Sequence, residues 1–419
     1  MTSFKNKSLI SWCLYDWANS VLATIIFTFI FPIYFSRNIV GNEELGSTYW
    51  GYVIGFSGLF IAIIGPILGS ITDTYGPRKV IFGSLTFITI VATLALFWAL
   101  PDSNFIFYAL IFVAIATIGF ELAQAQYNAM LPDIAPPKMI GKLSGISWGL
   151  GYLGGLFCLA IALIGFIGIG DNNANLFNLS TDQNLNIRAT CILAALWYGL
   201  FALPLFLWVP DRSKNIYQEP LLKTSFLHLI ATLKNITTTS KNTLWFLIAS
   251  SIYRDGLNTL FIVGGLYAAG TFHISFQEIL IFAVGLNVAS ALGSFSLSFF
   301  DDKYGSQSII TVSLIALIIL GSSIIIIHDK NAFLYTSLLL GFFIGPVQSS
   351  SRVLMAHLSP KNQSTEMFGL YTMSGKSIAF TGPLLFAFMT HITNNQRWGI
   401  ASIIVLWAVG LFLFRKVKI

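Results

Sequence analysis

Long apolar stretches separated by short polar connections run along the whole chain. Each stretch holds about 20 residues, the length that crosses about 30 Å of hydrocarbon as an α-helix. The pattern predicts an all-α integral membrane protein with twelve transmembrane helices. Their expected positions are residues 10–35, 49–72, 79–100, 104–131, 141–169, 187–209, 243–270, 275–300, 306–327, 331–358, 364–391 and 397–414.

The longest polar connection divides these stretches into two sets of six. Residues 1–209 are expected to form one six-helix bundle and residues 243–419 a second, joined by a linker at 210–242. Between Lys223 and Lys234 the linker places apolar residues on one helical face, which favours an amphipathic helix on the membrane surface. A plain tether is the alternative. The residues of that face are Leu222, Phe226, Leu229, Ile230 and Leu233.

The two halves share short sequence matches in the same order. The matches are Tyr15-Asp16-Trp17-Ala18-Asn19-Ser20 with Tyr253 to Thr259, Asp73-Thr74-Tyr75-Gly76 with Asp302-Lys303-Tyr304-Gly305, and a 224-residue shift that aligns Gln124 with Gln348 and Gly145 with Gly369. Parallel six-helix repeats are the internal symmetry of major facilitator transporters, whose substrate site lies between the repeats. We therefore expect two pseudo-symmetric bundles.

Lys and Arg are distributed unevenly over the loops. The two termini and the even-numbered loops hold sixteen of the 23 basic residues, and the opposite loops hold four. Because basic loops stay in the cytoplasm, this bias predicts that both termini are cytoplasmic. The expected location is the cell membrane, as a multi-pass protein of a bacterial inner membrane.

The connection after the second stretch carries glycines, an acid and two bases at fixed spacing. These residues are Gly69, Asp73, Gly76, Arg78 and Lys79, and their spacing resembles the signature loop of the major facilitator superfamily. Glycines permit close packing and a tight turn, and Asp73 is expected to meet basic groups or a helix N-terminus across the bundle. We interpret the loop as a gate. A basic turn that only anchors topology is the alternative.

Polar residues also interrupt the apolar stretches. A charge at the centre of a membrane helix costs about 2.5–3.5 kcal/mol on insertion scales, so it usually faces a bundle interior or a watery cavity. These residues are the predicted substrate and coupling site: Asp16, Asn19, Glu121, Gln124, Asn128, Arg254, Asp255, Asn258, Gln348, Arg352 and Lys376.

Several of these residues have a second interpretation. Glu121, Gln124 and Asn128 share one helical face and also fit an interhelical hydrogen-bond seam. Arg352 lies about 9 Å from the cytoplasmic end of its helix, so its side chain could reach the interface. Asp16 lies near the start of its helix, where a favourable interaction with the helix dipole competes with a coupling role.

Depth within the membrane suggests ion pairs among the charged residues. Arg254 and Asp255 are neighbours on one helix and point about 100° apart, so each needs a partner from elsewhere. Glu121 is the expected partner of Arg254, and Lys376 that of Asp255, because the members of each pair lie at similar depth.

Composition excludes several classes of protein. Hydrophobic residues make up 55% of the chain and charged residues only 10%, with a mean hydropathy of +0.77, which excludes an ordinary soluble protein. The net charge of +6 is spread over short loops, so nucleic-acid binding is not expected. Three cysteines lie in apolar stretches without metal-ligand or disulfide spacing. No metal, cofactor or nucleotide motif is found, no enzyme activity is expected, and no cleavable signal peptide is expected.

Several motifs together are similar to the vacuole-effluxer-like branch of the major facilitator superfamily. They are Trp12 to Ser20, Tyr127 to Asp133, Gly151 to Gly155, Tyr253 to Gly256, Gln348 to Pro360, Phe368 to Tyr371, Ser374 to Lys376 and Gly382-Pro383. Pro346-Val347 departs from the expected small residues. The branch contains fungal autophagy-linked vacuolar amino-acid effluxers and bacterial relatives, so the resemblance implies solute transport and, from its fungal members, amino-acid efflux.

The sequence therefore favours a secondary active transporter that works by alternating access as a monomer. An amino acid or small peptide suits a cavity with charges of both signs, and proton coupling is plausible through Asp16, Glu121 or Asp255. An organic anion or metal chelate is an alternative substrate. A receptor or scaffold on a transporter fold, without flux, is the alternative function.

Overall fold

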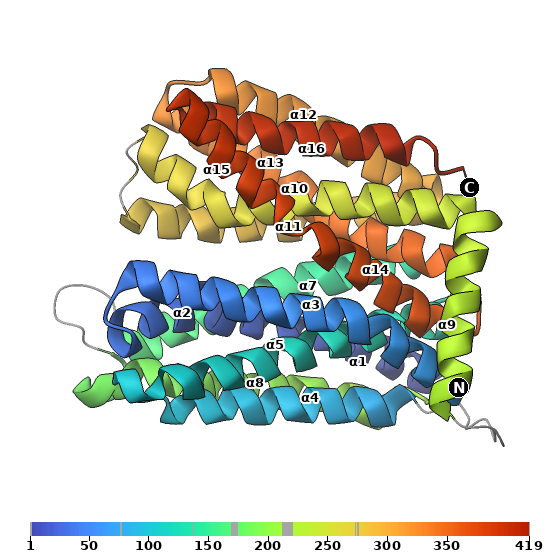
Figure 1. The fold of residues 1–419 in the computed structure, drawn as a ribbon, viewed down its shortest axis with the longest axis horizontal. Coiled ribbons are helices and arrows are strands. Elements are labelled where there is room, and N and C mark those ends of the chain that lie inside the picture. The colour runs from blue at the N-terminus through green and yellow to red at the C-terminus, as the bar shows by residue number, and fades with distance from the viewer. Residues whose placement is uncertain are drawn as a thin grey trace. The chain divides into compact units, whose positions relative to one another are not determined.

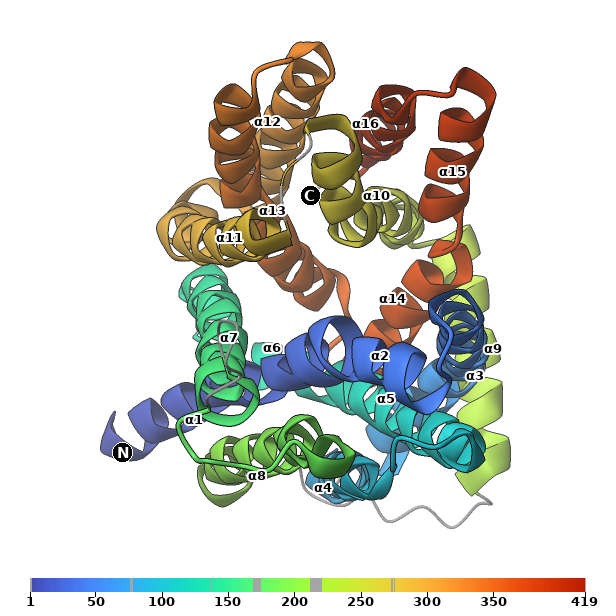
Figure 2. The same ribbon diagram turned by 90° about the vertical axis from the view of Figure 1, so that its left-hand side faces the viewer.

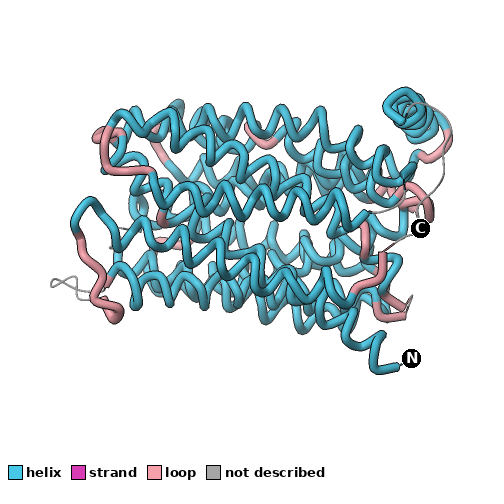
Figure 3. Tube along the Cα trace, turned by 90° about the horizontal axis from the view of Figure 1, so that it is seen from below, coloured by secondary structure: helices cyan, strands magenta, loops and turns pink. Residues whose placement is uncertain are grey.

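A computed structural model describes residues 2–75, 78–136, 138–168, 175–211, 221–272, 274 and 276–418. In this part of the chain, helices are joined by loops and turns, and there is no strand (Figure 3). Each of the twelve predicted transmembrane positions is helical over most of its described residues. Helical backbone is required because hydrocarbon offers no partner for a free N–H or C=O group.

The helices of the first half begin with an irregular span. The elements are α1 (Thr2–Val21), η1 (Leu22–Phe29), α2 (Phe31–Tyr34), η2 (Phe35–Ile39), α3 (Glu43–Tyr75), α4 (Arg78–Ala95), η3 (Leu96–Trp98), η4 (Ser103–Phe105), α5 (Ile106–Asn128), α6 (Leu131–Ile134), α7 (Ile140–Ile161), η5 (Ala162–Ile167), η6 (Asp182–Asn184) and α8 (Leu185–Trp208). Segments η1, η2 and η5 are π-helical. Such wide turns are rare and mark local irregularity.

The second half follows a helix within the linker. Its elements are α9 (Leu221–Thr238), α10 (Lys241–Phe272), α11 (Phe276–Tyr304), α12 (Ser306–Ile326), α13 (Lys330–Leu358), α14 (Ser364–Ile378), α15 (Thr381–Thr393) and α16 (Gln396–Phe414). Among the described residues, ten helices are long and apolar enough to span a membrane. The two further predicted spans are α10, where Arg254, Asp255 and Asn258 lower the mean hydropathy, and the divided α14–α15.

Contacts group the chain into two compact units. The first comprises residues 1–61, 76–127 and 150–214, and the second comprises 62–75, 128–149 and 215–419. The second unit thus contains the second half of the sequence together with two short pieces of the first half: residues 62–75 of α3, and residues 128–149, which hold the end of α5, α6 and the start of α7.

An aromatic core holds the first unit together. Trp12 stacks on Tyr127 with ring centroids 4.6 Å apart, and Tyr15 lies against Phe82 and Tyr198. The Trp12 indole N–H donates to the Tyr127 carbonyl, and the Tyr127 hydroxyl donates to the Trp12 carbonyl at 2.9 Å. These contacts join α1 to α5. Because the polar ends of the rings are paired, the rings remain buried without an unsatisfied group.

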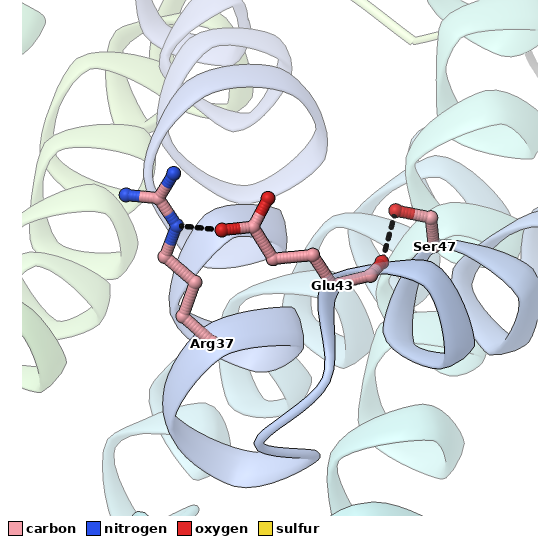
Figure 4. A network of polar contacts seen from close by, with 3 residues as sticks. All are labelled: Arg37, Glu43 and Ser47. Atoms are coloured by element: carbon pink, nitrogen blue, oxygen red, sulfur yellow. Dashed lines mark hydrogen bonds and ion pairs between the residues drawn. The ribbon is translucent and has the colours of Figure 1, made fainter.

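An exposed polar cluster marks the start of α3 in the same unit (Figure 4). Arg37 Nε lies 2.8 Å from Glu43 Oε1, and the Ser47 hydroxyl donates to the Glu43 carbonyl. Both charged side chains are more than 60% exposed. The pair is therefore worth little stability and mainly defines the turn before α3.

The second unit is built around α10 and α13. Helix α10 packs against α16, and α13 packs against α11 and α12 (Figure 2). Helix α9 runs crosswise to α10 (Figure 1). Of the predicted linker face, Leu229 is buried whereas Ile230 and Leu233 are exposed; the side chains of Leu222 and Phe226 lie outside the described residues. Within the described part of the linker, residues 221–238 form α9. The amphipathic contact of this helix with the membrane surface stays a prediction.

The eleventh span is broken, although the sequence analysis treated residues 364–391 as one helix. Helix α14 ends at Ile378 and α15 begins at Thr381. Pro383 explains the interruption, because proline has no N–H to donate and its ring clashes with the carbonyl four residues earlier. Gly382 permits close packing at the break, since a methyl group there would lie 2.0 Å from Thr259 Oγ1 of α10.

Candidate functional site

Three predicted site residues form a hydrogen-bonded chain in the first unit. The Asn19 amide donates to Gln124 Oε1 at 2.9 Å and to Asp16 Oδ1 at 3.4 Å. Asp16 and Asn19 are buried on α1, and Gln124 is half-buried on α5. The arrangement links the two helices through polar groups within the apolar layer.

Glu121 lies half-buried one turn before Gln124 on α5. Its expected partner, Arg254, belongs to the second unit. The pairing of Glu121 with Arg254 therefore stays a prediction. Asn128, the third residue of that face, also belongs to the second unit.

Arg352 is fully enclosed within the second unit. Its side chain donates to the Ser144 hydroxyl at 2.9 Å, to the Ser144 carbonyl at 2.7 Å and to Asn128 Oδ1 at 3.3 Å. The guanidinium also lies 5.6 Å from the ring centroid of Trp148. Arg352 is only 2% exposed, so it does not extend to the interface. Charge-assisted hydrogen bonds to three acceptors offset the cost of its burial.

Gln348 lies half-buried on α13, one turn before Arg352. Next to it, the Ser349 carbonyl accepts a hydrogen bond from the Ser144 hydroxyl at 2.8 Å. Ser144 thus makes three hydrogen bonds with α13, although the sequence analysis did not select it. The one feature of the sequence that could have indicated Ser144 is its position next to Gly145 in a glycine-rich helix. A hydroxyl on a face of small residues can reach a neighbouring helix.

Arg254 lies over an aromatic ring. Its guanidinium carbon is 4.0 Å from the ring centroid of Tyr371, and Nη1 donates to the Tyr371 carbonyl at 3.4 Å. Gly375 lies beside this guanidinium, where a methyl group would be in ordinary contact with Nη1 at 3.4 Å. Tyr371 was recognised only as part of a family motif. Cation–π contact gains strength when the cation is withdrawn from water.

Asp255 meets a helix N-terminus, and the predicted pairing with Lys376 is wrong. Its Oδ2 accepts a hydrogen bond from the backbone N–H of Gly382, the second residue of α15, at 2.7 Å. The break in the eleventh span creates this partner, because the first N–H groups of α15 have no acceptor within their own helix. Lys376 lies half-buried in the last turn of α14, and Asn258 is exposed on α10.

Two aspartates cap helices within the second unit. Asp73 Oδ2 accepts from the backbone N–H of Glu366, in the first turn of α14, at 2.8 Å. Asp302 accepts from the N–H groups of Gly141 and Lys142, in the first turn of α7, at 2.7 and 2.9 Å. A carboxylate at a helix N-terminus is favourable because it meets free N–H groups and the positive end of the helix dipole.

The predicted gating loop is divided between the two units. Gly69 packs in the second unit, where a methyl group would lie 2.6 Å from the Thr365 carbonyl. Arg78 and Lys79 belong to the first unit. Arg78 is buried, and the Lys79 ammonium donates to the Phe206 carbonyl at 2.9 Å. Gly76 lies outside the described residues.

An apolar groove of about 400 Å³ lies between α3 and α5 in the first unit. Aromatic residues line it, among them Tyr49, Tyr52, Phe56 and Phe60. It contains none of the predicted site residues. Among the described residues, no group of three or more His, Cys, Asp or Glu side chains could hold a metal ion. The candidate site residues therefore form separate sets of polar contacts, one on α1 and α5 in the first unit and one on α10, α13 and α14 in the second.

Twelve membrane-spanning segments in two repeats, with polar groups inside the apolar layer, define a transporter of the major facilitator fold. Its fold is similar to that of the proton:xylose symporter XylE, with a TM-score of 0.74 at 14% identity, covering 100% of this chain and 96% of that one. The chain belongs to the vacuole effluxer Atg22-like family, whose profile matches residues 37–419. The predicted family and fold are confirmed.

The chain is similar to bacterial and fungal proteins. The chain is 29% identical over 409 residues to YxiO of Bacillus subtilis (strain 168), an uncharacterized MFS-type transporter, and the match covers 96% of this chain and 93% of YxiO. It is 20% identical over 302 residues to autophagy-related protein 22 of Cryptococcus neoformans, covering 66% of this chain and 53% of that protein. The chain thus spans about half the length of the fungal relative. Its membership places it among transporters rather than enzymes.

Proposed function

We propose that the protein moves a small polar solute, either an amino acid or a small peptide, across the membrane by alternating access coupled to protons. The observation that supports this proposal is that charged residues of both signs are buried within spanning helices: Asp16 on α1, Asp255 on α10 and Arg352 on α13. Buried charges are costly in a membrane and usually mark ion or substrate paths. A zwitterionic solute complements both signs.

The paired helix caps support a gate on the predicted cytoplasmic side. Asp73 connects the end of α3 to α14, and Asp302 connects the end of α11 to α7. Each contact joins a segment of one sequence half to a segment of the other. In this proposal residues 1–209 and 243–419 move as two bundles and these contacts break when the cytoplasmic side opens. The termini are cytoplasmic, the membrane is a bacterial inner membrane, and the transporter is a monomer.

Flux in reconstituted vesicles tests the proposal. The full chain in liposomes, under a pH gradient, should accumulate at least one member of a panel of radiolabelled amino acids and dipeptides, and a protonophore should abolish the accumulation. Uptake of organic anions or metal chelates alone would show that the substrate class is wrong. Binding without uptake of any compound would indicate a receptor.

Glu121→Gln tests the coupling role on α5. The substitution keeps the shape of the side chain and removes the proton that it could carry, so accumulation driven by the pH gradient should fall to equilibrium. Exchange of internal for external solute, which needs no net proton movement, measures whether the carrier is intact. Full proton-driven accumulation by Glu121→Gln would show that Glu121 belongs to an interhelical hydrogen-bond seam instead.

A further inference from the structure

The carboxylate of Asp255 differs from that of Asp301, the other buried aspartate of the second unit. Asp255 is 1% exposed, and among the described residues its Oδ1 is buried with no hydrogen-bond partner. By contrast, both oxygens of Asp301 accept hydroxyl groups, from Ser306 and Ser350. An ionised carboxylate with one unsatisfied oxygen is expensive to keep inside an apolar layer.

No cation within the described chain neutralises this group. Among the described residues, the side chain of Asp255 makes one hydrogen bond, with the N–H of Gly382. The charged and titratable side chains on its own helix are Lys241, Tyr253, Arg254 and Tyr267. Those on α13 to α16 are Lys330, Tyr335, Arg352, His357, Glu366, Tyr371, Lys376, His391 and Arg397, and none of either set pairs with Asp255. The charged residues of α9 and α11 lie toward the ends of those helices. Protonation at Oδ1 is therefore the simplest way to neutralise the carboxylate of Asp255.

The hydrogen bond made by the other oxygen, Oδ2, connects the charge of Asp255 to the start of α15. Helix α15 is a separate half-helix of 13 residues, and Asp255 Oδ2 holds its first turn. The ionised carboxylate attracts the N–H groups and the positive end of the helix dipole, whereas the neutral acid is a weaker acceptor and loses the attraction to the dipole. The charge on Asp255 thus biases the position of α15.

The repeat shows that this arrangement belongs to the second half. The 224-residue shift aligns Gly382 and Pro383 with Cys158 and Leu159 of α7. Without a proline, the described part of the fifth span stays helical through α7 and η5. The break is therefore specific to the second half, whereas its carboxylate has an equivalent in the repeat, Asp16.

We infer that Asp255 is the proton-binding site of the protein and that α15 responds to its charge. One proton forms an O–H bond at Oδ1 and neutralises the carboxylate, and α15 then moves away from α10. Release of the proton breaks that bond and restores the contact with Gly382. Use of this movement for coupling rests on the proposed transport function, but the movement itself does not.

Distances between spin labels test the inference within the second unit. Labels replace Phe388 on α15 and Ile319 on α12, both exposed, in the full chain with its three cysteines substituted. Between about pH 9 and about pH 5 the distance should shift by on the order of 2–5 Å. Asp255→Asn should show the low-pH distance at both pH values. A pH shift that persists in Asp255→Asn would overturn the inference.

Two further variants keep the test independent of folding defects. Asp301→Asn changes a buried carboxylate whose oxygens are both hydrogen-bonded, and the pH shift should persist. Gly382→Ala keeps Asp255 but places a methyl group against Thr259, so α15 should be displaced even at high pH. Gly382→Ala with the wild-type distance and pH response would contradict the role of this contact. Absence of solute flux would contradict the proposed function and leave these distances unaffected.

Discussion

Arg352 illustrates at the scale of a residue how a charge is accommodated inside a membrane bundle. Its planar guanidinium reaches the hydroxyl and the carbonyl of Ser144 and also Asn128 Oδ1. A lysine ammonium has a different shape and cannot meet acceptors in that fork-like arrangement. The position therefore depends on the geometry of arginine as well as on its charge.

Arg352→Lys should destabilise the protein by about 2 kcal/mol, because at least one buried acceptor on Ser144 would lose its donor. Thermal unfolding of the purified protein in detergent measures the change. The matched control is Arg37→Lys, where the ion pair with Glu43 is exposed and the expected loss is about 0–1 kcal/mol. Equal loss of stability in the two variants would contradict the role of burial.

At the scale of the elements, the same contact occurs three times in the second unit: an aspartate caps the N-terminus of a helix. Asp73, Asp302 and Asp255 each place a carboxylate on the first turn of a helix from another segment, namely α14, α7 and α15. Asp73 and Asp302 have equivalent places in the sequence repeat. The three contacts together hold the starts of three helices in the second unit.

Loss of either cap should loosen only its own helix. Asp302→Asn should speed amide hydrogen exchange at the start of α7, and Asp73→Asn at the start of α14, each about fivefold if the contact contributes about 1 kcal/mol. Hydrogen exchange with mass spectrometry measures both segments in each variant, so each is the control for the other. Under the proposed gate both variants also favour states open to the cytoplasm. Equal or absent changes at both helix starts would show that the caps contribute no local stability.

At the scale of the whole molecule, the sequence repeat reappears in the packing of the second unit. A methyl group at Gly145 would meet Ser294 and Ser298 of α11, and one at Gly369 would meet Gly65 and Pro66 of α3. The same 224-residue shift aligns Asn128 with Arg352, and these two residues are hydrogen-bonded. Close contact of small residues allows helices to pack tightly in a membrane, where no hydrophobic driving force brings them together.

Membrane orientation is a property of the whole chain and follows from its basic loops. A cysteine at Asn173 should react with an impermeant thiol reagent in intact cells, and a cysteine at Asn215 should react only after the cells are opened. Both positions lie outside the described residues, so the expectation rests on the distribution of Lys and Arg. The opposite labelling pattern would reverse the orientation.

The sequence by itself determined the spans, the repeat and the family. Transfer of a segment into hydrocarbon depends mainly on its own composition, so local hydropathy locates α3 or α12 without knowledge of their neighbours. Family motifs are likewise short stretches of sequence, so they can be recognised without the structure. Asp73 was expected to meet either a basic group or a helix N-terminus, and the second is observed.

Only the tertiary structure decided which partners the buried polar groups have. Asp255 meets Gly382, 127 residues away, and Arg352 meets Ser144, 208 residues away. The break between α14 and α15 exposes the N–H that Asp255 accepts, and depth alone wrongly favoured Lys376. The physical reason is that the free energy of a buried polar group depends on the donors and acceptors around it. Those groups come together only when distant helices pack.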